Sequence, residues 1–220
     1  MQSNISITIA RELGSGGSYI GKLVANLLGY AYIDREILLA AAKELGFEED
    51  ELQGRGERLQ SIWERLMSVF AIGVPDAVYT PPRRWITDEE LIKTQRHLLC
   101  ELAGKGNCVV LGYGAFYLLR GRTRLFNVFV HAPATFRMER VMSIYHAKSK
   151  IEAAGMIQRS DRERERYVRS FCGFDRFDAR NYHLSIDTSI IDFTTAANLI
   201  ISMAGKLPEE THWPWVNEPV

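Results

Sequence analysis

The sequence predicts a doubly wound α/β fold, in which helices cover both faces of a five-stranded parallel sheet. Short apolar runs that suit buried parallel strands alternate with segments whose apolar residues repeat at helical spacing. A glycine-rich turn joins the first run to the first helical segment, which is typical of a strand–loop–helix unit. Ligands of such sheets bind at the carboxyl ends of the strands, so the residues that follow each run are the candidates for a site.

Each expected strand is a short run that is either rich in β-branched residues or continuously apolar. The run NCVVL at 107–111 and the run LFNVFVH at 125–131 have the continuous apolar character of central parallel strands. The five runs are Ile5–Ala10, Ala31–Ile33, Asn107–Leu111, Leu125–His131 and Tyr182–Ile186.

Helical patterns fill the intervals between these runs. Apolar residues from Ile20 to Leu28 repeat at helical spacing and are followed by Gly29, which is placed as a C-cap. Thr87 and Glu90 form a capping box for a helix that runs to about Ala103. The other segments with helical patterns are Glu36–Leu45, Leu59–Phe70, Ala134–Ile157 and Phe193–Met203.

Composition indicates a globular protein with a substantial hydrophobic core. The 220 residues are 46% hydrophobic and 25% charged, and 27 acidic side chains balance 27 basic ones. This balance gives no overall field for nucleic acid, and no stretch approaches the roughly 18 apolar residues of a membrane span. We therefore expect a cytoplasmic protein that binds neither nucleic acid nor membrane. Three cysteines without a CxxC spacing predict reduced thiols rather than zinc or disulfides.

The turn Gly14-Ser15-Gly16-Gly17-Ser18 is the strongest candidate for a ligand site. A glycine loop at the start of a helix presents backbone N–H groups to a phosphate, and three glycines in four residues are hard to explain by turn geometry alone. A Walker A loop, GxxxxGK[ST], requires a lysine after Gly16, but Gly17 stands there. The spacing also differs from the GxGxxG pattern of dinucleotide-binding folds. The loop therefore predicts a phosphate cradle made of backbone.

The stretch Ile9–Asp34, IARELGSGGSYIGKLVANLLGYAYID, resembles the opening of the cytidylate kinase-like family. Val109–Gly114 is similar to the family's third strand and following loop, and Arg159–Arg166 resembles its arginine-rich lid. Asp187-Thr188-Ser189 is similar to the loop beneath the adenine. The resemblance spans about Ile5 to Met203, and 46–85 is its least matched part.

This resemblance implies a single P-loop kinase-like domain over residues 1–220, with three α/β/α layers and a five-stranded parallel sheet. Its core covers about 5–45 and 86–205. A helical monophosphate-binding insertion covers about 46–85, a lid covers about 145–172, and residues 206–220 form a loosely held tail. ATP and Mg²⁺ are the implied cofactors, with the magnesium held by nucleotide phosphates and water rather than by protein ligands.

The candidate site residues divide by role. Three arginines of the lid, which share one helical face if the segment is helical, would stabilise the moving charge: Arg159, Arg162 and Arg166. The nucleotide would contact the glycine loop and the loop after the last strand: Gly14, Ser15, Gly16, Gly17, Ser18, Tyr19, Asp187 and Thr188. The acceptor would contact Asp34, Arg83, Arg84 and Tyr113. Three alternatives stay open. Asp34 is a plain N-cap, Arg83 and Arg84 lie in a surface loop, or the lid is a solvated helix with the ion pairs Asp161–Arg164 and Glu163–Arg166, in which Arg164 lies off the shared face.

Several positions depart from the family pattern. Gly17 and Tyr19 replace the lysine and threonine of classical cytidylate kinases, and Ser18 stands where lysine-free relatives carry arginine. Tyr113 stands where the family has an arginine that grips the acceptor monophosphate, and Leu111 replaces an aspartate. Catalytic charge must then come from elsewhere, mainly from the lid.

Three functions remain in view. The first is ATP-dependent phosphoryl transfer to a nucleoside monophosphate, CMP- or dCMP-like, or to a related small phosphorylated acceptor. The second is a catalytically weak or inactive nucleotide-binding protein, and the third is a kinase for a non-nucleotide acceptor. Trp213 and Trp215 in the tail cover a subunit contact of a homo-oligomer or fold back on the domain.

Overall fold

The computed structural model describes residues 5–34, 89–103, 106–112 and 114–208. Several predictions fall outside this range: the helices Glu36–Leu45 and Leu59–Phe70, the capping box of Thr87, and the insertion over 46–85. Arg83, Arg84, Tyr113, Trp213 and Trp215 also lie outside the described residues.

Five parallel strands form the sheet, in the order β2-β3-β1-β4-β5. Strand β1 is central, and its Ile9 lies between Leu111 of β3 and Val128 of β4. The strands are β1 (Ile5–Arg11), β2 (Ala31–Ile33), β3 (Cys108–Leu111), β4 (Arg124–His131) and β5 (Leu184–Asp187). The predicted five-stranded parallel sheet is thus confirmed, and every predicted strand appears within two residues of its expected bounds.

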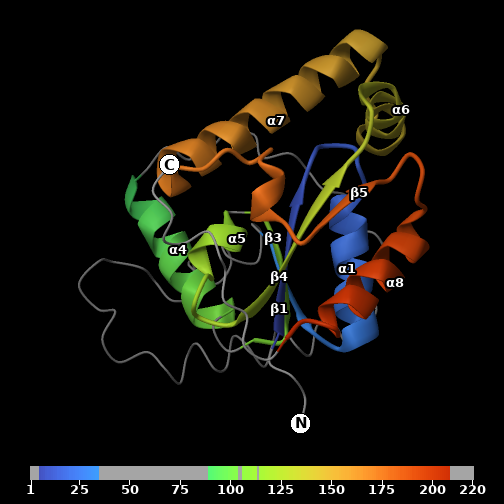
Figure 1. Cartoon of the computed structure of the whole chain (residues 1–220). Helices are drawn as coiled ribbons and strands as arrows, with labels where there is room; N and C mark the ends of the chain where they lie inside the picture. The colour runs from blue at the N-terminus through green and yellow to red at the C-terminus, as the bar shows by residue number, and fades with distance from the viewer. Residues whose placement is uncertain (1–4, 35–88, 104–105, 113, 209–220) are drawn as a thin grey trace.

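Helices cover both faces of the sheet (Figure 1). Helices α1 (Gly17–Leu28) and α8 (Phe193–Ala204) lie on one face, where they pack on Ile5, Ile7 and Ile9 of β1. Helices α4 (Glu89–Ala103) and α5 (Ala115–Leu118) lie on the opposite face. Successive side chains of a strand point to opposite faces, so the apolar runs are buried on both sides and the α/β/α layers follow.

Two further helices, α6 (Ala134–Tyr145) and α7 (Lys150–Cys172), lie over the carboxyl edge of the sheet (Figure 1). The sequence predicted one largely helical segment from Ala134 to Ile157, whereas the structure breaks it at His146, which has a φ of 55°. Ser149 then caps α7 by accepting the Glu152 N–H at 3.1 Å. Helix α7 continues through the whole charged run and ends at Gly173.

Two short elements were not anticipated: α5, with four residues, and a 3₁₀ turn over Ala179–Asn181. Neither is long enough to leave a periodic signal in the sequence. Helix α1 ends at Gly29, which has a φ of 64°, as its predicted C-cap role requires. The three cysteines are free thiols, as expected. Among the described helices, none combines the length and apolar character that a membrane span needs.

His183 gives the sheet a pH-dependent contact. Its Nδ1 accepts the Asn127 N–H of β4 at 2.8 Å, and its ring stacks on Phe126 with centroids 5.3 Å apart. This hydrogen bond needs a neutral ring, and partial burial lowers the pKa of His183 below its ordinary value. Because the unfolded pKa is about 6.5, the stabilisation is complete above that pH and is lost as pH falls through the folded pKa.

We therefore expect the free energy of unfolding to decrease from about pH 7 to pH 5, partly through this ring. The variant His183→Leu should lose that part of the decrease, whereas His97→Gln, at an exposed position on α4, should keep it. Urea titrations at a series of pH values measure both. Equal pH dependence of wild type and His183→Leu would contradict the assignment.

Candidate active site

The glycine loop connects the central strand to α1 and has a conformation that requires glycine. Gly14 and Gly16 have φ values of 85° and 82°, which residues other than glycine rarely adopt. A β-carbon at Gly14 would lie 2.7 Å from the Arg137 carbonyl oxygen. A β-carbon at Gly16 would lie 2.5 Å from Cζ of Phe193. Conformation and close packing thus both exclude a side chain at these two positions.

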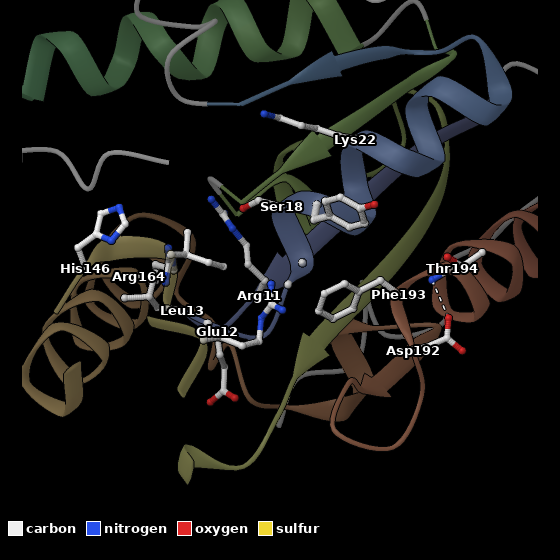
Figure 2. Close-up of a pocket in the computed structure, with 16 residues that line it drawn as sticks. Arg11, Glu12, Leu13, Ser18, Lys22, His146, Arg164, Asp192, Phe193 and Thr194 are labelled. Carbon is white, nitrogen blue, oxygen red and sulfur yellow. Dashed lines mark hydrogen bonds between the residues drawn. The ribbon is translucent and has the colours of Figure 1, made fainter. Parts of the chain in front are cut away.

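A cavity of about 680 Å³ opens on this loop (Figure 2). Its size lies within the range of small-molecule sites, about 300–1,000 Å³. Residues from the loop, α1, α6, α7 and the start of α8 surround it. The lining residues are Arg11, Glu12, Leu13, Gly14, Gly16, Gly17, Ser18, Tyr19, Lys22, Arg140, Ile144, His146, Arg164, Asp192, Phe193 and Thr194.

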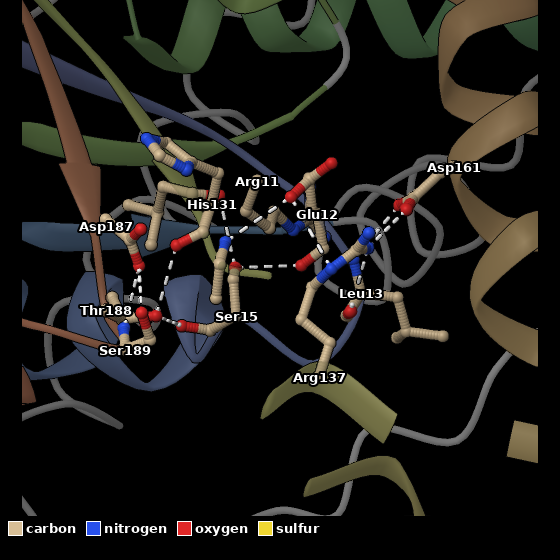
Figure 3. A network of polar contacts seen from close by, with 12 residues as sticks. Arg11, Glu12, Leu13, Ser15, His131, Arg137, Asp161, Asp187, Thr188 and Ser189 are labelled. Carbon is tan, nitrogen blue, oxygen red and sulfur yellow. Dashed lines mark hydrogen bonds and ion pairs between the residues drawn. The ribbon is translucent and has the colours of Figure 1, made fainter. Parts of the chain in front are cut away.

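Ser15 and Thr188 hold the loop against the sheet rather than line the cavity (Figure 3). The Ser15 hydroxyl lies within hydrogen-bonding distance of two backbone carbonyl oxygens, those of Glu12 (2.9 Å) and Val130 (3.1 Å). The Thr188 hydroxyl lies 2.7 Å from the Ser15 carbonyl and 3.2 Å from that of His131. Both residues were predicted to contact nucleotide, and that role stays a prediction.

Asp187, also predicted to contact nucleotide, closes a local turn. Its carboxylate accepts from the Ser189 N–H (2.9 Å) and hydroxyl (2.7 Å), and these bonds lower the pKa of Asp187. Asp187 does not line the cavity. Asp192, five residues on, does line it and caps α8 by accepting the N–H groups of Thr194 and Thr195.

A largely buried ionic network ties the loop to α6 and α7 (Figure 3). Asp161 of α7 accepts the Leu13 N–H at 3.0 Å and the Arg137 Nη1 at 2.5 Å. Arg137 also lies 3.5 Å from a Glu12 carboxylate oxygen. The side chains of Arg137, Glu12 and Asp161 are only 10 to 15% exposed. Three elements far apart in the chain therefore meet at one carboxylate.

Four cationic side chains line the cavity: Arg11, Lys22, Arg140 and Arg164. The Arg140 guanidinium lies 4.4 Å from the centre of the Phe193 ring, and burial lowers the pKa of Arg140. Phe193 in turn contacts Tyr19, with ring centroids 5.7 Å apart. The cavity thus joins an aromatic wall to a positive one, which suits an anion that carries an apolar ring.

The predicted lid arginines do not reach this cavity. Arg159, Arg162 and Arg166 share an exposed face of α7, as their spacing predicted, but none of them lines it. Arg164, which was expected to lie off that face, is the α7 arginine in the cavity. The reason is Asp161, one turn earlier, which faces the loop and lies 3.4 Å from Arg164 Nη1. A catalytic role for the exposed trio stays a prediction and requires α7 to move.

The remaining predicted site residues also divide into those that line the cavity and those that do not. Gly14, Gly16, Gly17, Ser18 and Tyr19 line the cavity. Asp34 is half-buried after β2 and does not line it, so its role with the acceptor stays a prediction.

The sequence reasoning did not single out Arg11, Glu12, Arg140 and Phe193. Arg11 and Glu12 directly follow β1, at the strand end where ligands of such sheets bind, so their position was available as a signal. Arg140 and Phe193 reach the loop only through the packing of α6 and α8, which no local pattern reveals. Among the described residues, no three His, Cys, Asp or Glu side chains form a group that would hold a metal ion.

Comparison with known proteins identifies the family of this chain over most of its length. A model of the cytidylate kinase-like family matches residues 6–190. An uncharacterized protein from Eubacterium ventriosum ATCC 27560 has a similar structure, with a TM-score of 0.67 and 20% identity over 91% of this chain and 98% of that one. A shikimate kinase from Acinetobacter baumannii, solved in complex with shikimate, has a TM-score of 0.48 and 14% identity over 91% and 93%. The first likeness shows the fold alone, and the second is too distant to bear on function. No curated protein sequence matches the chain.

The ionic network predicts that Asp161→Ala is strongly destabilising. It would leave Arg137 poorly paired in a largely buried position and remove the acceptor of the Leu13 N–H, at a cost of about 3 kcal/mol. Glu165→Ala is the matched control on the same helix, because Glu165 forms a partly exposed pair with Arg169 that contributes less than about 1 kcal/mol. Denaturant unfolding measures both. Similar losses in the two variants would show that the network does not anchor the loop.

Proposed function

The chain belongs to the cytidylate kinase-like family, and on that premise we propose that it transfers a phosphoryl group from ATP to a nucleoside monophosphate. Family membership supports phosphoryl transfer in general. The finer proposal, a CMP- or dCMP-like acceptor, follows the family resemblance of the loop and the strands around it.

The observation that carries this proposal is the cavity over the glycine loop. The loop backbone lies at the carboxyl end of the central strand and the amino end of α1, where N–H groups and the helix dipole favour a phosphate. Four cationic side chains line the same cavity, so it favours a polyanion. Tyr19 and Phe193 offer aromatic surface next to the loop, which suits the base of a nucleotide.

Phosphoryl transfer depends on positioning and on positive charge around the transferred group, more than on covalent chemistry from the protein. In the proposed role, the backbone from Gly14 to Ser18 binds the donor phosphates. Arg140 of α6 and Arg164 of α7 line the other side of the cavity, and there they offset the negative charge of the phosphates. An acceptor phosphate needs no general base because its oxygen is already ionised.

Magnesium fits this arrangement as a partner of the substrate. Both carboxylates that line the cavity already accept hydrogen bonds: Glu12 accepts from the Ala132 N–H, and Asp192 accepts from the N–H groups of Thr194 and Thr195. Ser18 lines the cavity at the first turn of α1 and offers a hydroxyl ligand. In the proposal, the phosphates and water would hold the ion, Ser18 would be its contact from the protein, and the ion would neutralise charge on the phosphates.

A second candidate, nucleotide binding with little or no turnover, is favoured by specific positions. Gly17 and Tyr19 lack the side chains that classical relatives place on the phosphates and the magnesium ion. In this alternative, the exposed Arg159, Arg162 and Arg166 of α7 would serve a signal rather than a reaction.

A coupled assay of ADP release separates the two candidates. Purified protein is given ATP and Mg²⁺ with CMP, dCMP and each other nucleoside monophosphate in turn, and then with small non-nucleotide acceptors. We expect turnover above the ATP-only background with at least one monophosphate, and highest with a cytidine one. Calorimetric binding of ATP without turnover on any acceptor would support the second candidate, and turnover with non-nucleotide acceptors alone would reassign the substrate.

The loop itself provides a test by mutation. Gly16→Ala places a β-carbon against Phe193 and forces an unfavourable φ, so the phosphate cradle should be distorted. We expect kcat/KM to fall by about 100-fold or more, in line with losses of transition-state contacts. Gly155→Ala, in the second turn of α7 with open space around it, should keep full activity and gain up to about 1 kcal/mol in stability. Unchanged activity in Gly16→Ala would exclude the loop from the reaction.

A further inference from the structure

Position 17 is closed to side chains by Arg11. A β-carbon at Gly17 would lie 2.5 Å from the Arg11 Cβ, 3.1 Å from its Cγ and 3.3 Å from the Val130 Cβ. Unlike Gly14 and Gly16, Gly17 does not have a positive φ. Glycine is therefore needed at this position for space alone, and the side chain that occupies the space is that of Arg11.

The other end of the same side chain reaches the next strand. A β-carbon at Gly112, which directly follows β3, would clash with the Arg11 Nη1. Strands β1 and β3 are neighbours, and the Gly112 N–H donates to the Ile9 carbonyl at 3.1 Å. The arginine thus extends from one strand end to the other between two glycines, each of which leaves the room that it needs.

The backbone at Arg11 is held firmly. Arg11 is the last residue of β1 and pairs in register with Val130 of β4. Its carbonyl accepts a hydrogen bond of 2.8 Å from Nη2 of Arg176, a side chain that is buried. The guanidinium therefore projects from a rigid strand end, whereas a Walker lysine projects from the loop itself.

The other cations of the cavity come from helices rather than from the end of a strand. The Lys22 Nζ lies 5.9 Å from the centre of the Tyr32 ring, Arg140 lies over Phe193, and Arg164 pairs with Asp161. Arg11 is the cavity cation whose side chain overlaps the place of residue 17. That place belongs to the phosphate-binding lysine in a Walker A loop.

We propose that Arg11 supplies the positive charge on the donor phosphates that a lysine at position 17 would otherwise supply, and that the two side chains exclude one another. This inference rests on the proposed binding of a nucleoside triphosphate at the loop. Arginine suits the role because its planar fork binds two phosphate oxygens at once and stays charged at all relevant pH values.

The first experiment measures binding of ATP and of inorganic tripolyphosphate by calorimetry, and ATP turnover in parallel. Arg11→Met keeps the aliphatic stem and removes the charge, so it should weaken both probes by about 10-fold or more and lower turnover by about 100-fold. Arg11→Lys should recover part of each loss. Arg169→Ala, an exposed arginine of α7, is the charge-matched control and should change neither. Lys22→Met should weaken binding less than Arg11→Met.

The second experiment exchanges the two positions. Gly17→Lys alone should lose affinity, because the new side chain meets Arg11. The double variant Arg11→Gly/Gly17→Lys restores a lysine and opens its space, so it should bind both probes more tightly than either single variant. Glycine is required at position 11 in this exchange because the closest approach is between the two β-carbons. Thermal melting of each variant identifies any that fail to fold.

The outcomes separate this inference from the proposed function. Folded Arg11→Met that binds both probes as tightly as wild type overturns the inference, even if the wild type is an active kinase. Arg11-dependent binding of both probes without turnover on any acceptor supports the inference and counts against the proposed transfer. If Arg11→Met does not fold, Arg11→Lys and the exchange decide, and an exchange no tighter than Gly17→Lys overturns the inference. A wild type that binds neither probe overturns both.

Discussion

The ion pair between Asp161 and Arg137 is the contact on which the geometry of the site depends. One carboxylate accepts from the loop backbone at Leu13, from α6 through Arg137 and from its own helix through Arg164. Each charge is largely buried, and a buried charge is costly unless its partner stays in place. The three elements are therefore coupled: displacement of one leaves the charges of the others unpaired.

This coupling bears on the exposed arginines of α7. Arg159, Arg162 and Arg166 flank Asp161 on the same helix, yet they face solvent while Asp161 faces the loop. If α7 rotates to bring them inward, it withdraws Asp161 from Leu13 and Arg137. If α6 and α7 pivot together, Asp161 keeps its ion pair with Arg137. Because Asp161 also accepts the Leu13 N–H, the two helices can move the arginines only as far as the loop moves with them. The network thus favours movement of the two helices as a body over rotation of α7 alone.

The sequence was a good guide to the fold because the relevant signals are local. Continuous apolar runs, helical spacing and the cap at Gly29 each depend on a few neighbouring residues, and together they determine the layers of the sheet. The site was harder to predict. Spacing correctly grouped Arg159, Arg162 and Arg166 on one face of α7, but the face that meets the loop is chosen by the pairing of Asp161 with residues 24 and more positions away. Arg140 and Phe193 likewise reach the cavity through packing between helices, which no local pattern records.

The three loop glycines show why the missing lysine is weak evidence against catalysis. Gly14 and Gly16 are needed for a positive φ and for the close approach of Arg137 and Phe193. Gly17 is needed because Arg11 fills the space beside it. A lysine at position 17 would have to displace an arginine that lines the same cavity, so its absence removes no charge from the site as a whole. What phosphoryl transfer requires is positive charge at the phosphates, from whichever element supplies it. Under the role proposed for Arg11, a glycine at position 17 is compatible with phosphoryl transfer, because the strand end supplies the charge that the loop lacks.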